Sequence, residues 1–192
     1  MAQRKTQFAP GEYYHIYNRG CNKERIFFED GNYLFLLNKL GEGANEHHIS
    51  VLVYCLMPNH YHFLMRQDGE TSVAVLMQEV FNSYTKAINR KYHRSGTLFQ
   101  GPYKSTHVDK EEYLLHLCRY IHRNPLDGGL VKNIEEWDYS NYLECIGRRN
   151  RSLYDPGFIA EYDPQAHGSG SQRSQSILLG YSDGFLGCNI VI

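Results

Sequence analysis

The chain lacks long apolar runs, clustered cysteines and a strong net charge, and each absence narrows what the protein can be. No apolar run approaches the roughly 20 residues that cross a bilayer, so the sequence predicts no membrane-spanning segment. The five cysteines are scattered and form no CxxC pair, which argues against a thiolate zinc site and fits a reducing compartment. The first 15 residues lack the apolar stretch of a signal peptide, and we therefore expect a cytoplasmic protein.

The formal net charge of −1 hides an uneven distribution of charge along the chain. Residues 71–110 contain six Lys or Arg and two acidic residues, a local excess of four positive charges. Such a run also occurs on ordinary solvated surfaces, so it does not by itself establish a nucleic-acid partner. The 16 tyrosines have the same ambiguity, because their rings fill cores as readily as they stack on bases.

The length of 192 residues and the hydrophobic content of 42% are typical of one globular domain with an appendage. We expect this domain to span residues 1–150. Residues 167–176 (HGSGSQRSQS) are rich in Gly, Ser and Gln, a composition typical of a flexible linker. Residues 151–192 are therefore predicted to form a linker and a C-terminal tail, whose role the sequence leaves open.

Hydrophobic periodicity predicts the element order β-α-β-β-α-β-α. The expected strands are 12–19, 49–55, 60–66 and 103–108, and the expected helices are 31–46, 72–92 and 110–121. Asp30, Thr71 or Ser72, and Asp109 are the expected helix caps, and Pro125 is expected to stop the third helix ahead of Asn124. This order favours an α+β fold: a ferredoxin-like antiparallel sheet with helices packed on one face.

Two histidines flank one large residue in the run MPNHYHFLM, which begins at Met57. Side chains alternate along a strand, so His60 and His62 share one face and Tyr61 points to the other. Two imidazoles on one face can share a divalent metal ion and leave positions for substrate oxygens. The alternative is an accidental pair, because the chain contains 10 histidines.

A second candidate site lies in the run YIHRNP, where Tyr120 and Asn124 are four residues apart on one face of a helix. A phenol beside a bound metal or beside Arg123 can attack a phosphate, and an amide oxygen can complete a metal site. From chemistry alone, Tyr113 and Tyr103 compete with Tyr120 for this role, and a packed core tyrosine is the simpler alternative.

The basic region contains cations and aromatic rings that suit a single DNA strand, with cations on its backbone and rings against its bases. An ordinary exposed turn would explain the same residues. The candidate DNA-binding residues are Arg19, Lys86, Arg90, Lys91, Arg94, Phe99, Tyr103, Lys104 and Arg123.

Four motifs occur in order: MPNHYHFLM, HRSGTLFQGPYKS, YIHRNP followed by GLV, and WDYSNY, which begins at Trp137. Together they resemble the single-tyrosine HUH transposases of bacterial insertion sequences, most closely the REP-associated tyrosine transposases. The resemblance covers about residues 10–146. It implies a ferredoxin-like fold and an enzyme that depends on Mg²⁺ or Mn²⁺ and cuts single-stranded DNA beside hairpins. In this family the tyrosine forms a 5′-phosphotyrosine link and leaves a free 3′-hydroxyl, so that strands can be rejoined.

The resemblance also implies residue roles. His60, His62 and Asn124 match the metal ligands, and Tyr120 matches the nucleophile. Trp137 and Tyr142 match a Trp-x-x-Ser-x-Tyr element of the REP-associated branch, whose role stays open. Tyr61 departs from the aliphatic residue that is usual between the two histidines.

The resemblance leaves the oligomeric state open, because members of the family are described as monomers or as homodimers with shared active sites. Two other functions remain alternatives from the sequence. One is a domesticated, non-catalytic DNA- or RNA-binding regulator, and the other is a metal-dependent nuclease in which water attacks.

Overall fold

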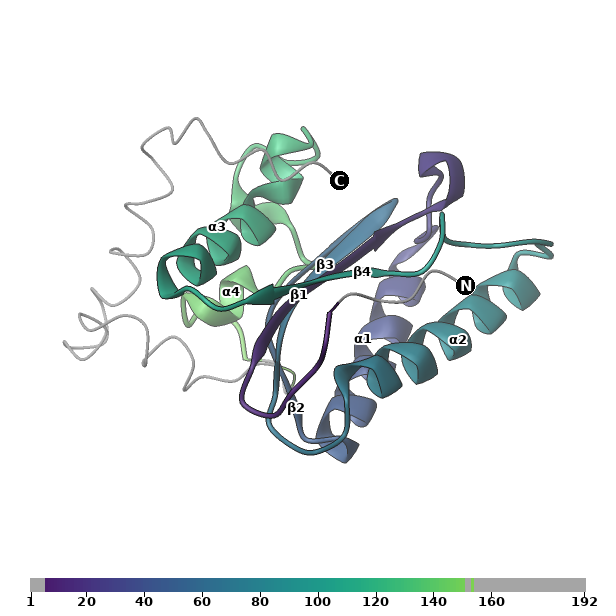
Figure 1. The fold of residues 1–192 in the computed structure, drawn as a ribbon. Coiled ribbons are helices and arrows are strands. Elements are labelled where there is room, and N and C mark those ends of the chain that lie inside the picture. The colour runs from purple at the N-terminus through teal and green to yellow at the C-terminus, as the bar shows by residue number, and fades with distance from the viewer. Residues whose placement is uncertain (1–5, 151–152, 154–192) are drawn as a thin grey trace.

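A computed structural model of the chain describes residues 6–150 and 153 (Figure 1). The strands are β1 (Tyr13–Arg19), β2 (Ile49–Met57), β3 (His60–Gln67) and β4 (Lys104–Val108). The helices are α1 (Asp30–Glu46), α2 (Val73–Lys91), α3 (Glu111–Asp127) and α4 (Tyr142–Cys145), with short 3-10 turns η1 (Cys21–Lys23) and η2 (Ile134–Glu136). The expected element order is confirmed. The expected linker and tail at 151–192 lie outside the described residues, apart from Leu153.

The four strands form one antiparallel sheet with the order β2-β3-β1-β4. The tight turn at Pro58 and Asn59 joins β2 to β3, so the two histidines lie at the start of an inner strand. In the register of β1 with β3, Tyr17 pairs with His62 and Arg19 pairs with His60. The α+β class and the ferredoxin-like sheet are therefore confirmed, and the histidine pair lies on an inner strand near one end of the sheet.

Helices cover both faces of the sheet, which corrects the expectation that they pack on one face (Figure 1). The helices α1 and α2 pack on the face that carries Tyr61 and Phe63. The helix α3 packs on the opposite face through Leu114, Leu117 and Ile121. The reason is visible in β2, where nearly every residue is buried, because a strand that is apolar on both sides needs cover on both sides.

The helix α3 continues through Pro125 to Asp127, so the expected stop ahead of Asn124 is wrong. Proline lacks an N–H, which leaves the carbonyl of Ile121 without its usual helical donor. The Asn124 side chain compensates, because its Nδ2 donates to the carbonyls of Tyr120 at 2.8 Å and Ile121 at 3.4 Å. The side chain that the sequence marks as a metal ligand therefore also repairs the helix.

The predicted helix starts are correct to within about a residue. Ser72 is the N-cap of α2, and its hydroxyl accepts a hydrogen bond from the Ala74 N–H at 3.2 Å. Asp30 is instead the first residue of α1, and α3 begins after Lys110 rather than after Asp109. In the described part of the chain, no helix has the length and apolarity needed to cross a membrane.

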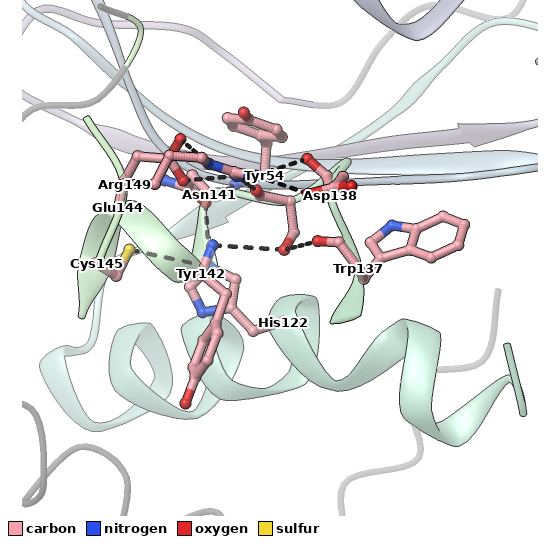
Figure 2. A network of polar contacts seen from close by, with 10 residues as sticks. Tyr54, His122, Trp137, Asp138, Asn141, Tyr142, Glu144, Cys145 and Arg149 are labelled. Carbon is pink, nitrogen blue, oxygen red and sulfur yellow. Dashed lines mark hydrogen bonds and ion pairs between the residues drawn. The ribbon is translucent and has the colours of Figure 1, made fainter. Parts of the chain in front are cut away.

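The segment from Trp137 to Asn141 closes the outer edge of β2 (Figure 2). The Leu56 N–H donates to the Tyr139 carbonyl at 2.8 Å, and the Trp137 indole donates to the Leu56 carbonyl at 3.2 Å. Asn141 makes the central contacts, since its Oδ1 accepts from the Tyr54 N–H at 2.8 Å and its Nδ2 donates to the Leu52 carbonyl at 2.8 Å. The sheet edge is thus covered rather than left open to pairing.

An ion pair between the half-buried Arg149 and the buried Glu144 holds this closing segment in place (Figure 2). Arg149 binds both carboxylate oxygens of Glu144, at 2.6 and 2.7 Å, and also donates to the carbonyls of Asp138 and Ser140. On the other side, His122 of α3 lies 3.1 Å from the Asn141 amide oxygen. The segment therefore connects the edge of β2 to the helix that carries Tyr120, which gives the Trp137–Tyr142 element a structural role.

Candidate active site

His60 lies at the start of β3 with its two ring nitrogens in different surroundings. Its Nδ1 is 2.7 Å from Asn59 Oδ1, and the Asn59 amide nitrogen donates to the Lys23 carbonyl at 3.1 Å. Asn59 Oδ1 must therefore accept, which places the proton on Nδ1 and a lone pair on Nε2 of the neutral ring. That Nε2 is 3.3 Å from Asn124 Oδ1, which is also an acceptor because the Asn124 Nδ2 donates to Tyr120.

Two lone pairs that face each other at this distance repel unless a cation or a proton lies between them. Burial lowers the pKa of His60, so the imidazole carries no extra proton at neutral pH. The arrangement of His60 and Asn124 therefore fits a shared metal ion.

His62 is fully buried, and one of its nitrogens has no partner. Its Nδ1 lies 3.0 Å from Nε2 of His15, a residue of β1 that is also buried. Among the described residues its Nε2 has no hydrogen-bond partner, although buried polar atoms nearly always have one. This nitrogen lies on the same face of the sheet as His60 Nε2 and has an unused lone pair. It is therefore suited to be the second metal ligand.

All three histidines are neutral at neutral pH. Burial lowers the pKa of His15 to about 4, and burial also puts the pKa of His62 well below its usual value, with a smaller contribution from the neighbouring histidines. Neutral imidazoles keep the lone pairs that metals bind. In the described part of the chain, no three His, Cys, Asp or Glu side chains group as metal ligands, so a site here depends on the amide oxygen of Asn124.

Tyr120 lies beside the histidine pair. Its ring meets the His62 ring edge-on, with centroids 5.4 Å apart, and the His15 ring at 6.4 Å. Burial raises the pKa of Tyr120 to about 12, and a side-chain hydrogen bond with Asn124 partly opposes this shift. The side chain is therefore a neutral phenol at neutral pH, and deprotonation requires a nearby positive charge.

The competing tyrosines are placed elsewhere. Tyr113 is two helical turns before Tyr120 on α3, about 10 Å along the axis. Tyr103 lines a cleft beside α2, on the side of the sheet away from α3. Of the three tyrosines that the sequence left open, Tyr120 is the one that the fold packs edge-on against His62.

The predicted DNA-binding residues do not form one surface. Arg19 and Lys104 flank a cleft beside Tyr17, whose ring stacks on His62 with centroids 5.7 Å apart. Phe99 and Tyr103 line the second cleft, beside α2. Arg123 is an i,i+4 neighbour of Asp127 on α3, with a distance of 3.1 Å.

The remaining four lie on or just after α2. Lys91 pairs with Glu29, and Arg94 lies 3.6 Å from Glu24. Lys86 and Arg90 are exposed on α2. Lys91 therefore connects the end of α2 to the start of α1, and Arg94 connects two loops, whereas Lys86 and Arg90 remain available to a ligand.

Sequence reasoning missed two residues that complete the site, His15 and Tyr17. Both lie on β1 and alternate with Tyr14 and Ile16, which point into the α1–α2 core. Alternation alone places His15 and Tyr17 on one face. Their proximity to His62 follows only when β1 is known to pair with β3.

Comparison with known proteins places the chain in a family. The family described as "Transposase IS200 like" matches residues 10–124. A curated protein of Haemophilus influenzae, named as a REP-associated tyrosine transposase, is 22% identical over 108 residues, which are 50% of this chain and 61% of that protein. The chain thus aligns with less than two thirds of that relative's length.

Two solved structures are similar. The structure of a REP-associated tyrosine transposase bound to a REP hairpin has a TM-score of 0.65 and 16% identity, and the match covers 81% of this chain and 89% of that chain. A transposase of Deinococcus radiodurans has a TM-score of 0.42 and 14% identity, over 64% of this chain and 97% of that chain. The first of these likenesses establishes the fold.

Proposed function

This chain belongs to the IS200-like transposase family, and from that premise we propose that it is a metal-dependent DNA strand transferase. Its substrate is single-stranded DNA beside a hairpin, which it cleaves and rejoins through a 5′-phosphotyrosine intermediate. The observation that carries the proposal is the position of the Tyr120 phenol against His62, whose buried Nε2 lacks a partner. The similarity to a protein solved with a REP hairpin supports hairpin DNA as the partner.

His60 Nε2, His62 Nε2 and Asn124 Oδ1 would hold a Mg²⁺ or Mn²⁺ ion. Two nitrogen ligands favour Mn²⁺ over Mg²⁺, which prefers oxygen. When bound, the ion would supply Lewis-acid polarisation of the scissile phosphate and neutralise charge on the leaving oxygen. His15 would act through His62, because accepting a hydrogen bond from Nδ1 leaves the lone pair on Nε2.

The chemical step is a transesterification at phosphorus. The Tyr120 Oη–P bond forms and the P–O3′ bond breaks, so one phosphodiester replaces another. The phenol loses one proton and the leaving 3′-oxygen gains one, so charge and atoms balance. Because the 3′-hydroxyl can attack the phosphotyrosine in reverse, the strand can be rejoined without an external energy source.

One chain supplies all the side chains of this proposed site. Tyr120 lies next to the His62 of its own chain, and Asn124 next to its own His60. We therefore propose a site that is complete within one subunit. A monomer would then be competent for cleavage.

The test is a cleavage assay with a panel of hairpin-bearing single-stranded DNAs, including any palindromic repeat found beside the gene. With Mn²⁺, 3′-labelled DNA should migrate with the protein on a denaturing gel, and 5′-labelled DNA should give a shorter free product. Tyr120→Phe should abolish both signals, whereas Tyr113→Phe, the matched control on the same helix, should retain them.

Each alternative gives a different pattern. Free products from both labels would indicate attack by water and overturn the phosphotyrosine proposal. Binding that survives EDTA, with no cleavage in any metal, would indicate a non-catalytic DNA-binding regulator. An adduct that persists in Tyr120→Phe would show that another residue is the nucleophile.

A further inference from the structure

Strand β4 covers only part of the β1 edge of the sheet. The uncovered part lies beside the face that carries His60, His62 and Tyr17, which we call the catalytic face. Strand β4 pairs with β1 only as far as Tyr17, which is opposite Lys104. The loop that precedes β4 rejoins β1 at Arg19, whose carbonyl accepts from the Gln100 N–H at 3.0 Å. Between these two points the loop is held by Asn18, whose Nδ2 donates to the Gly101 carbonyl at 2.9 Å. Side chains on both faces of β1 meet the loop here.

Two clefts share this opening. The smaller has a volume of about 170 Å³ and lies beside Tyr17, Arg19 and Lys104. The larger has a volume of about 310 Å³ and lies between the loop and α2. Asn18, Gly101 and Pro102 line both clefts, so the clefts adjoin. The smaller cleft continues the catalytic face, because the Tyr17 ring stacks on His62.

The larger cleft has aromatic walls and an amide rim. Tyr61 stacks on Phe81 with centroids 4.5 Å apart, and Phe99 meets Phe81 edge-on at 5.4 Å. Gln78 and Asn82 lie one turn apart on α2, exposed at the rim of the cleft. Within the described residues, neither amide has a hydrogen-bond partner. Both are therefore available to a ligand.

We propose that the larger cleft binds one unpaired nucleobase of the single strand that runs from the Tyr120 site, and this rests on the proposed function. We call it the base cleft. Its volume is at the small end of ligand clefts, which span about 300–1,000 Å³, and suits one base better than a longer ligand. The half-buried rings of Phe99 and Tyr103 offer stacking surface, whereas Tyr61 and Phe81 are buried behind them, and a side-chain amide offers one donor and one acceptor to the edge of a base.

The charges around the clefts suit the phosphates of the same strand. Arg19 and Lys104 line the smaller cleft, between the catalytic face and the base cleft. Lys86 and Arg90 extend along α2 beyond Asn82 and are exposed. A DNA strand would thus meet cations before and after the inserted base. The phosphate contacts would position the DNA, and the base contact would specify its sequence.

The test combines abasic substitution in the DNA with amide removal in the protein. The probe is a fluorescein-labelled hairpin with a single-stranded flank of about eight nucleotides, with one abasic site placed at each flank position in turn. Binding to the full chain is measured by fluorescence anisotropy in EDTA, so that no cleavage occurs. The variants are Asn82→Ala and the matched control Asn38→Ala, an exposed amide on α1.

We expect one flank position at which the abasic site weakens binding about tenfold in the native protein and in Asn38→Ala. At that position the abasic site should weaken the binding of Asn82→Ala less than that of Asn38→Ala, because the amide contact is already lost and only the stacking contact remains to be removed. A 2-aminopurine at the same position should be quenched on binding, and Tyr103→Ala should reduce this quenching.

Equal abasic effects in Asn82→Ala and Asn38→Ala at every position would overturn the base cleft. If the same preparation still formed the covalent adduct, the proposed function would stand without it. The reverse result, coupling at one position without any adduct, would support the base cleft as a binding site and contradict the strand-transferase proposal. Absence of any DNA binding would overturn both.

Discussion

The two faces of the sheet are built by the same strands and have opposite characters. On β3, Tyr61 and Phe63 point to α1 and α2 and join a dense aromatic core. His60 and His62 point to α3, where buried polar atoms face one another and one nitrogen has no partner. The difference shows that neighbouring residues of β3 serve different purposes: one side chain packs in the core, and the next lies in the proposed active site.

The polar groups on the α3 face are costly for stability. A buried polar atom without a hydrogen bond destabilises a protein by about 1–3 kcal/mol. The α1–α2 face has the packing that can offset this cost. We therefore expect substitutions on the two faces to separate stability from activity.

The largest separation should come from neighbouring residues of β3. His62→Ala removes a proposed metal ligand and should reduce the rate of adduct formation by about 10³-fold or more, because the scissile phosphate loses its Lewis acid. Tyr61→Ala removes a large buried side chain and should lower the free energy of unfolding by about 3 kcal/mol. Gel quantification of the adduct and urea denaturation measure the two effects.

Tyr61→Phe is the control for the second substitution, because it keeps the packed ring and should cost much less stability than Tyr61→Ala. If His62→Ala retained the native adduct rate in Mn²⁺, the assignment of the α3 face to catalysis would fail. If His62→Ala destabilised the protein more than Tyr61→Ala, the two faces would not differ in the way described above.

How much of this contrast the sequence could reveal depends on the range of the interactions involved. The alternation in MPNHYHFLM is local, so the shared face of His60 and His62 and the opposite face of Tyr61 were predictable. The cap at Ser72 and the hairpin at Pro58 and Asn59 were predictable for the same reason.

One error is local, and the others involve contacts between distant segments. The continuation of α3 through Pro125 depends on the Asn124 amide, which no proline rule includes. The placement of α3 on the second face depends on the burial of both sides of β2. His15 was missed because its role requires the pairing of β1 with β3, and the closing contacts of Asn141 require the free edge of β2.

The next largest effect concerns the link between α3 and the sheet (Figure 2). Asn141→Ala should lower the free energy of unfolding by about 3 kcal/mol, because the Tyr54 N–H, the Leu52 carbonyl and His122 each lose a buried partner. Asn133→Ala, which removes an exposed amide before η2, should cost less than about 1 kcal/mol. Equal urea midpoints for the two variants would contradict the role given to Asn141.

The α3 face should also make the protein sensitive to acid. Burial lowers the pKa of His15 and of His122 to about 4, while the unfolded chain titrates near 6.5. The unfolded state therefore binds more protons between pH 6.5 and about 4. The stabilisation that each neutral histidine contributes is fully present above pH 6.5. As the pH falls through this window, the free energy of unfolding should decrease by about 1.4 kcal/mol per pH unit for each of these histidines.

Urea denaturation of the metal-free protein at several pH values between 7 and 4 measures this slope. His122→Asn should reduce it by about one proton, and His116→Asn, at an exposed position on the same helix, is the matched control. A slope that His122→Asn does not alter would show that His122 is not held neutral by burial.

The smallest expected effect concerns the contact between His15 on β1 and His62 on β3. His15→Phe keeps a ring beside Tyr17 and removes the nitrogen that faces His62 Nδ1, so His62 loses the partner that orients its lone pair. Loss of such a supporting contact should weaken Mn²⁺ binding about tenfold, as measured by the electron paramagnetic resonance of free Mn²⁺. His15→Gln, whose amide oxygen can accept the same hydrogen bond, should restore part of the affinity. Equal weakening by His15→Phe and His15→Gln would mean that His15 acts by packing alone, and the histidine pair of β3 would then bind metal without help from β1.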